Sequence, residues 1–145
     1  MVECGEKCAV FGVYAPGSDV SSMTHAALWT LQHRGQEGTG IATADGQVLR
    51  IKKNLGLVTQ VYSDSDLLYL QGHIAVGHNR YSTSGSSTVE HVQPVLRHDC
   101  QVALAHNGNL PDTTKLEKFL HSVGIATLQS NDSEMMADAI HYYFI

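Results

Sequence analysis

The feature that most constrains the fold is a series of short apolar runs, each of strand length. They occupy residues 8–14, 39–44, 47–52, 73–78 and 101–105. Runs of this length, separated by polar and glycine-containing segments, are typical of buried β-strands. Two of them end directly in polar clusters, Asn79-Arg80 and His106-Asn107-Gly108. Polar residues at strand ends are common in active sites, so the pattern predicts a site at one rim of a sheet.

Segments with helical periodicity alternate with these runs. Ser21 or Ser22 is suited to cap a first helix, Asp112 or Thr113 starts a second, and residues 131–134 open a third. The first two helices are expected to end at glycines, Gly35 and Gly124. The apolar stripes of the three helices are Met23, Ala27, Leu28 and Leu31; Leu116, Phe119, Leu120 and Val123; and Met135, Met136, Ala139, Ile140 and Tyr143. The mixture predicts an α+β fold, with sheet layered against helices.

Turn-forming residues predict the remaining connections. Asp45-Gly46 is expected to join the second and third apolar runs in a tight hairpin, which this dipeptide favours. Residues 67–70 predict a single helical turn, and residues 82–94, rich in Ser, Thr and Gly, predict a mobile loop.

Composition and charge narrow the classes of function. The chain has 145 residues, 43% of them hydrophobic, which is the length of one domain and enough to bury a core. A formal charge of -5, with 16% charged residues, argues against nucleic acid or an anionic membrane as partner. Glu3, Glu6 and Lys7 do not fit a signal peptide, so we expect a cytoplasmic protein. Three cysteines, an odd number, fit reduced thiols, and their spacing from the histidines predicts no metal site.

Cys8 admits two interpretations from the residues alone. A cysteine at the head of an apolar strand is commonly a small buried hydrophobic residue. Alternatively it is a nucleophile for acyl transfer, since polar groups suited to this chemistry follow downstream. Those groups have ordinary alternatives too: Asn107-Gly108 as a plain turn, Arg80 as a surface ion-pair partner and Asp132 as the N-cap of the last helix.

Several motifs, taken in order, resemble those of the class II glutamine amidotransferase family. They are Cys8-Ala9-Val10-Phe11-Gly12-Val13, Gln32-His33-Arg34-Gly35-Gln36-Glu37, His78-Asn79-Arg80-Tyr81-Ser82-Thr83, His106-Asn107-Gly108-Asn109 and Asn131-Asp132-Ser133-Glu134. The resemblance covers residues 8–145 and is strongest to the purine-synthesis branch of the family. Two departures are Ala9, where the family usually has glycine, and the last motif, which is usually Ser-Asp-Thr-Glu.

The resemblance implies a fold and a catalytic group. The fold is the four-layer α/β/β/α sandwich of the N-terminal nucleophile (Ntn) hydrolase type, incomplete here at the C-terminus. Cys8 is implied as the nucleophile that attacks the glutamine carboxamide. Asn107 and Gly108 are implied as the oxyanion hole, where losing one donor usually costs about 10²–10³ in rate.

The resemblance also implies the residues that bind glutamine. Arg80 is expected to hold the α-carboxylate, because its planar guanidinium can meet that ion with two hydrogen bonds. Asp132 is expected to hold the α-ammonium, while Tyr81 and Thr83 close over the bound substrate. His33, Arg34 and Gly35 match the family motif and are assigned a supporting role without a catalytic step.

In this family the nucleophilic cysteine is the first residue of the mature chain. The resemblance therefore implies that residues 1–7 are a propeptide and residues 8–145 a partial glutamine amidotransferase domain. Removal of residues 1–7 would give Cys8 a free α-amine, whose pKa of about 7.7–8.0 suits a base for a thiol of pKa about 8.5. Cys4-Gly5 is a rival start, although it would place Glu6 and Lys7 inside a buried strand.

The resemblance further implies partners. Ammonia would pass to phosphoribosyl pyrophosphate and give 5-phosphoribosylamine, on a C-terminal phosphoribosyltransferase domain absent from this span. No cofactor is implied for this span, Mg²⁺ is expected for the absent domain, and a homo-oligomer is expected at full length. Two alternatives stay open: the glutaminase part of another class II amidotransferase, such as one similar to glucosamine-6-phosphate synthase, or a truncated non-catalytic chain that binds glutamine or a partner.

Overall fold

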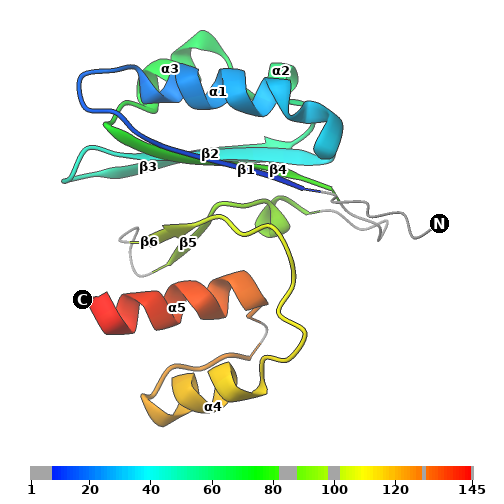
Figure 1. The fold of residues 1–145 in the computed structure, drawn as a ribbon, viewed down its shortest axis with the longest axis vertical. Coiled ribbons are helices and arrows are strands. Elements are labelled where there is room, and N and C mark those ends of the chain that lie inside the picture. Colours follow the sequence, from blue (N-terminus) through cyan, green and yellow to red (C-terminus); the bar gives the residue numbers. More distant parts are fainter. Residues whose placement is uncertain (1–7, 82–87, 98–101, 129, 145) are drawn as a thin grey trace.

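The computed structural model describes residues 8–81, 88–97, 102–128 and 130–144 (Figure 1). Its strands are β1 (Ala9–Tyr14), β2 (Gly38–Ala44), β3 (Leu49–Leu55), β4 (Ile74–Arg80), β5 (Val95–Arg97) and β6 (Val102–Leu104). Its α-helices are α1 (Val20–Thr30), α2 (Val58–Val61), α3 (Asp64–Tyr69), α4 (Thr114–Ser122) and α5 (Asp132–Phe144). Two short 3₁₀ helices are η1 (Gln32–Arg34) and η2 (Val89–His91).

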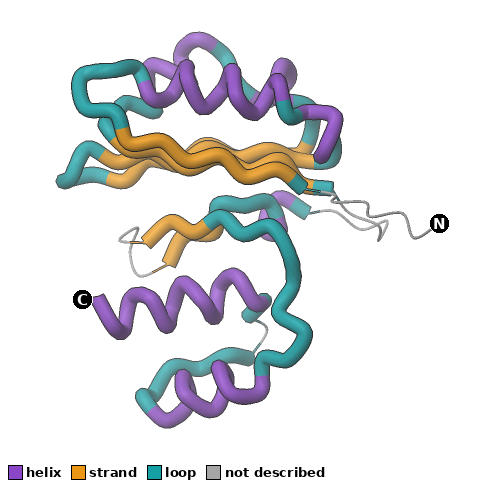
Figure 2. Tube along the Cα trace, viewed as in Figure 1, coloured by secondary structure: helices purple, strands orange, loops and turns teal. Residues whose placement is uncertain are grey.

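The elements stack in layers. Helices α1, α2 and α3 lie on one face of a four-stranded sheet, and the two-stranded sheet β5-β6 lies on the side of its other face (Figure 1). Helix α5 packs against β5 and β6, and α4 packs on α5. Figure 2 shows the resulting order of helix, sheet, sheet and helix. The structure thus confirms the four-layer α/β/β/α sandwich, with α4 added outside α5.

The register of the first sheet determines which residues meet at its rim. The strand order is β1-β4-β2-β3, and all neighbours are antiparallel. The start of β1 therefore lies beside the end of β4, where Ala9 pairs with Asn79. The start of β2 reaches the same end, where Gly38 pairs with Arg80. Cys8, which immediately precedes β1, is consequently delivered to the end of the sheet that carries Arg80.

The main core lies between α1 and the first sheet. Its fully or almost fully buried members are Leu28, Ile41, Val58, Val61, Tyr62 and Leu70. Complete burial of a leucine such as Leu28 contributes about 1.5–3 kcal/mol to folding. Helix α1 approaches β4 closely at Gly77, where a Cβ would lie 2.6 Å from the methyl group of Thr24. This contact fixes the strand that ends in the candidate site.

The first helix differs from the prediction at both of its ends. Its N-cap is Asp19, whose carboxylate accepts a hydrogen bond from Ser22 N, rather than Ser21 or Ser22. The α-helix ends at Thr30, and Gly35 is extended rather than a helix stop. Gly35 is needed for another reason: a Cβ there would lie 2.7 Å from Asn79 O, so only glycine lets the chain pass the end of β4.

The hairpin at Asp45-Gly46 is confirmed, and Gly46 has the positive φ of 87° that favours glycine. Four other features differ from prediction. Strand β3 runs farther along the chain than residues 47–52, whereas η2 and α2 were not predicted. Strand β5 was not predicted either, because three residues are too few to show a periodicity.

The predicted apolar stripe of the last helix is only partly correct. Met135 is buried as expected, but Ile140 and Tyr143 are exposed. The most buried face of α5 instead carries Ser133, Met135, Ala137 and Asp138. The reason is that α5 lies between β5-β6 and α4, so one face buries polar groups and another forms an aromatic contact, in which Tyr143 stacks on Phe119. In the part of the chain that the structure describes, no helix is both long and apolar enough to span a membrane.

Candidate active site at the rim of the first sheet

The thiol of Cys8 lies at the rim of the first sheet, outside the main core cluster. Its side chain is half-buried, and Sγ lies 3.5 Å from Tyr81 N and 3.7 Å from Tyr81 O. The sulfur therefore contacts the polar backbone of Tyr81, just beyond β4, whereas a purely structural cysteine would occupy an apolar interior. This placement favours the interpretation of Cys8 as a nucleophile.

The backbone carbonyl of Cys8 is held from two directions. Arg34 Nε donates to it at 3.1 Å, and the side-chain amide of Asn107 donates to it at 3.2 Å. Arg34 is delivered by η1, and Asn107 by the turn that follows β6. The structure thus brings together three segments that are distant in sequence, and it places Arg34, for which a supporting role is expected, in contact with the backbone of Cys8.

Asn107 and Gly108 form an exposed turn directly after β6. Gly108 has a φ of 142°, in the region that favours glycine, and a Cβ there would lie 3.3 Å from His106 Nε2. A side-chain amide and a glycine N–H are donors of the kind that form an oxyanion hole.

Arg80 is held at the end of β4 with part of its guanidinium unused. One terminal nitrogen donates to His91 O at 2.9 Å. Its Nε is buried and has no hydrogen-bond partner among the residues that the structure describes. Since buried donors are normally satisfied, this nitrogen is suited to an anionic ligand. Next to it, Tyr81 is exposed, whereas Thr83 lies outside the described residues.

Asp132 begins α5 and ties that helix to the turn after β6. Its Oδ2 accepts from Leu110 N at 3.0 Å and lies 3.9 Å from His106 Nδ1, while Oδ1 accepts from Ser133 N at 2.8 Å. The N-cap is the preceding residue, Asn131. Its Oδ1 accepts a hydrogen bond from Glu134 N, and its own backbone N–H donates to the Glu134 carboxylate. The interpretation of Asp132 as the N-cap is therefore wrong.

His78 lies buried on β4, two residues before Arg80. Burial, followed by the charge of Arg80, lowers the pKa of His78 to about 4. The imidazole is therefore neutral at physiological pH, and the fixed positive charge near the rim belongs to Arg80 and Arg34. No group of three or more His, Cys, Asp or Glu side chains within the described ranges is arranged to hold a metal ion.

One supporting residue was missed by sequence reasoning. Gln93 lies in the segment predicted as a mobile loop, yet its side chain bonds to His106 N and to Ser133 Oγ. The available signal was Pro94, because the residue before a proline is restricted to extended conformations. That restriction indicates a fixed backbone at the end of the predicted loop.

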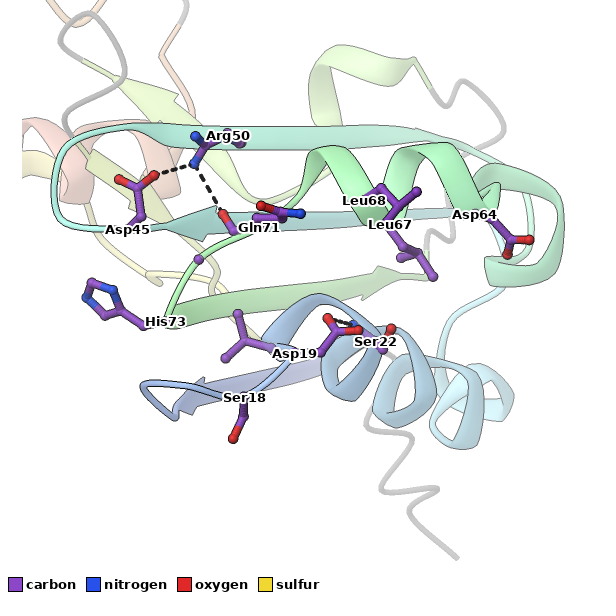
Figure 3. Close-up of a pocket in the computed structure, with 12 residues that line it drawn as sticks. Ser18, Asp19, Ser22, Asp45, Arg50, Asp64, Leu67, Leu68, Gln71 and His73 are labelled. Atoms are coloured by element: carbon purple, nitrogen blue, oxygen red, sulfur yellow. Dashed lines mark hydrogen bonds and ion pairs between the residues drawn. The ribbon is translucent and has the colours of Figure 1, made fainter.

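A large open pocket lined by described residues lies elsewhere. It has a volume of about 810 Å³ and is lined by the start of α1, the β2–β3 hairpin, α3 and the segment before β4 (Figure 3). These elements lie at the end of the sheet where Tyr14 pairs with Ile74, about 20 Å along the strand from Cys8. Its polar groups bond to one another, as Arg50 does with Asp45 and Gln71 O. The predicted residues form no part of it.

Comparison with known proteins shows that the chain is similar in sequence to amidophosphoribosyltransferases. The chain is 50% identical over 123 residues to amidophosphoribosyltransferase of Mycobacterium tuberculosis, covering 83% of this chain and 23% of that protein. It is 47% identical over 137 residues to the Synechococcus elongatus protein of that name (93% and 28%) and 41% identical over 138 residues to the Bacillus subtilis one (93% and 29%). No protein-family model matches the chain.

Solved structures agree with the sequence relatives. Glutamine phosphoribosylpyrophosphate amidotransferase from B. subtilis, complexed with ADP and GMP, matches with a TM-score of 0.75 and 39% identity, covering 91% of this chain and 29% of that chain. A structure described as the allosteric regulatory enzyme of purine biosynthesis matches with a TM-score of 0.78 and 40% identity over the same shares.

The sandwich and these neighbours define the class: an α+β fold of the Ntn-hydrolase type with a cysteine at the head of its first strand. Within that class the chain is homologous to the N-terminal part of amidophosphoribosyltransferases. It spans about a quarter of the length of the curated relatives that it matches.

Proposed function

We propose that the chain hydrolyses glutamine to glutamate and ammonia, with the thiol of Cys8 as nucleophile. The observation that carries this proposal is the contact of Asn107 with Cys8, because it places the Asn107 amide, followed in the chain by Gly108, against the backbone of the residue that carries the thiol. The homology to amidophosphoribosyltransferases, whose solved relative is a glutamine amidotransferase by name, supports the same reaction.

The first chemical step is attack on the side-chain carboxamide. We propose that residues 1–7, which lie outside the described residues, are removed, so that Cys8 carries a free α-amine. That amine takes the thiol proton, and the sulfur bonds to the carboxamide carbon while the C=O π electrons move to oxygen. The Asn107 amide and the Gly108 N–H stabilise the resulting oxyanion.

Collapse of this intermediate breaks the carbon–nitrogen bond. The ammonium at Cys8 returns its proton to the leaving nitrogen, so ammonia departs and a glutamyl thioester remains on Sγ. Water, deprotonated by the same amine, then attacks the thioester and releases glutamate, which regenerates the thiol. Glutamine is held meanwhile by Arg80 at its α-carboxylate and by Asp132 at its α-ammonium, with Tyr81 and Thr83 closing the site.

We infer that ammonia is used by the remainder of the relatives' architecture. There it would displace pyrophosphate from phosphoribosyl pyrophosphate and give 5-phosphoribosylamine, the entry to purine synthesis. Mg²⁺ belongs to that site, outside this chain, and the full-length protein is expected to be a cytoplasmic homo-oligomer. To distinguish this branch from other class II amidotransferases, phosphoribosyl pyrophosphate and sugar phosphates are compared as acceptors of the ammonia.

The test is glutamate release from L-glutamine by the intact protein as its host makes it. Cys8→Ala should abolish release while the protein stays folded, and Cys100→Ala, the same change outside the proposed site, should leave it intact. If the chain is a non-catalytic binder, neither the wild type nor Cys8→Ala will release glutamate. N-terminal sequencing of active material should begin at Cys8; a start at Cys4, or an uncleaved Met1, would contradict the proposed processing.

A further inference from the structure

The side-chain amide of Gln93 forms a bridge between two separate segments of the site. Its Oε1 accepts a hydrogen bond from His106 N, and its Nε2 donates to Ser133 Oγ at 3.2 Å. The first bond requires the oxygen of the amide to face the backbone N–H, which fixes the orientation of the whole group.

The two partners of Gln93 adjoin the two halves of the proposed glutamine site. His106 immediately precedes Asn107, whose side-chain amide donates to the backbone carbonyl of Cys8. Ser133 immediately follows Asp132 at the start of α5. One side chain therefore sets the turn after β6 against the first residue of α5, reinforcing the direct bond between Asp132 and Leu110 N.

Gln93 is itself held by the first sheet. Lys53 on β3 donates from Nζ to the carbonyl groups on either side of Gln93, those of Val92 and Pro94. The backbone of Gln93 also lies so close to Gly40 of β2 that a Cβ at Gly40 would clash with Gln93 O. A side chain anchored to one sheet thus sets the spacing of two groups carried by the other layers.

We infer that Gln93 is a positioning residue for glutamine hydrolysis, an inference that rests on the proposed function. It holds the Asn107-Gly108 turn and the Asp132 carboxylate at the separation that one substrate molecule requires. Loss of its bond to His106 N lets the oxyanion donors move, which reduces kcat. Loss of its bond to Ser133 lets Asp132 move, which weakens ground-state binding and raises KM.

The experiment measures kcat and KM for glutamine with the intact protein. Gln93→Met, similar in volume but unable to form either bond, should lower kcat about tenfold, less than the about 10²–10³-fold expected for loss of an oxyanion donor itself. It should also raise KM about fivefold, the usual effect of one lost hydrogen bond. Ser133→Ala should raise KM alone, and the double variant should raise KM no further than Gln93→Met does.

Controls separate positioning from general damage. Gln47→Met, the same change on the exposed β2–β3 turn, should match wild type. Alkylation of Cys8 by iodoacetamide, which needs no substrate pocket, should proceed at the wild-type rate in Gln93→Met. Gln93→Glu retains an acceptor for His106 N, with Lys53 offsetting the added charge, and should recover most of kcat. If Gln93→Met folds poorly, the kcat of Gln93→Glu tests the positioning role in its place.

Wild-type kcat and KM in Gln93→Met would overturn the inference, as would a kcat for Gln93→Glu no better than that of the methionine variant. Additive effects of Gln93→Met and Ser133→Ala on KM would also contradict the bridge. These results differ from failure of the proposed function itself, which would appear as no glutamate release by the wild type or as unchanged release in Cys8→Ala. With an active wild type and an inactive Cys8→Ala, only the role of Gln93 is in question.

Discussion

Asn107 donates its side-chain amide to the backbone carbonyl of Cys8 at 3.2 Å, a contact between residues 99 positions apart in the chain. Cys8 leads into β1 of the four-stranded sheet, whereas Asn107 follows β6 of the two-stranded sheet. The nucleophile and the oxyanion donor that we propose are therefore carried by different layers and meet where those layers end.

The contact makes Asn107→Ala an informative change. Because the residue is exposed, its loss should leave the free energy of unfolding nearly unchanged. Its loss should lower kcat for glutamine hydrolysis about 10²–10³-fold, since the oxyanion loses a donor. Steady-state kinetics checks this, with Asn109→Ala in the same exposed turn as the matched control. A kcat within a few-fold of wild type would remove Asn107 from the oxyanion hole.

Gly35→Ala should weaken glutamine binding by a purely steric route. The backbone of Gly35 is extended, so the change adds no torsional strain, but the new Cβ would lie 2.7 Å from Asn79 O and 2.9 Å from the carbonyl carbon of Arg80. Overpacking of this kind costs about 1–3 kcal/mol. Displacement of Arg80 should raise KM for glutamine more than it lowers kcat, as measured by initial rates.

Gly17→Ala supplies the contrast. Gly17 has a φ of 82° and open space around its Cβ position, at the end of the first sheet remote from Cys8. Alanine there should cost about 1 kcal/mol through backbone strain and leave KM unchanged. Equal effects of the two alanines on KM would show that Gly35 has no particular link to Arg80.

His78 should make the fold sensitive to acid. Its pKa is lowered to about 4 by burial and by Arg80, so the unfolded chain, with a pKa near 6.5, binds the proton more readily than the folded one. Stability should therefore fall as pH decreases from about 6.5 to about 4, by on the order of 3 kcal/mol. Urea unfolding at a series of pH values measures this.

Replacing the imidazole of His78 tests how much of the pH dependence of stability comes from this residue. His78→Asn should flatten the acid side of the stability profile, although it lowers stability overall by leaving space in a buried site. His121→Asn, at an exposed histidine, is the control and should keep the wild-type profile. A His78→Asn profile as steep as that of wild type would assign the acid sensitivity to other groups.

The ion pair between Arg97 and Asp138 should respond asymmetrically to mutation. Arg97 donates from Nε and Nη2 to the two carboxylate oxygens at 2.8 and 2.7 Å, and Asp138 is fully buried whereas Arg97 is 30% exposed. Arg97→Met leaves a buried charge and should cost about 3–5 kcal/mol. Asp138→Leu leaves an arginine that can reach water and should cost less, which thermal or urea unfolding resolves.

Two further variants complete this test: one that changes both residues of the ion pair, and one that breaks a more exposed ion pair. Arg97→Met with Asp138→Leu should recover much of the loss, since well-packed apolar groups often replace buried ion pairs without cost. Lys52→Met breaks the more exposed pair with Asp66 and should have a smaller effect. Equal losses for Arg97→Met and Asp138→Leu would show that burial does not govern the pair.

Local sequence patterns were sufficient for elements whose signal lies within a few residues. Asp45-Gly46 predicted its hairpin, and the run before Arg80 predicted β4. Asp19 and Gly35 were misjudged because their roles depend on neighbours: Asp19 caps α1 before the predicted serines, and Gly35 is required by the approach of β4. Strand β5 exists mainly through pairing with β6 and packing on α5.

The residues of the candidate site likewise differ in whether a local sequence pattern indicates them. Cys8, Arg80 and Asn107 stand in motifs, so the chain itself indicated them, and the structure brings Cys8 and Asn107 into contact. Gln93 and Lys53 stand in none of these motifs, and Pro94 indicates only the restricted backbone at Gln93. Their side chains gain their roles from carbonyl and N–H groups contributed by other segments. Supporting residues of this kind become visible only when the tertiary contacts are known.

The division of the site between two sheets has a consequence for how activity responds to stress. The second sheet consists of three-residue strands and is held to the first partly by Lys53 and Gln93. A small increase in the distance between the layers would separate Cys8 from the side-chain amide of Asn107 while every helix remained intact. The rate of glutamine hydrolysis should therefore report a loss of contact between the two sheets more sensitively than any measure of helical content.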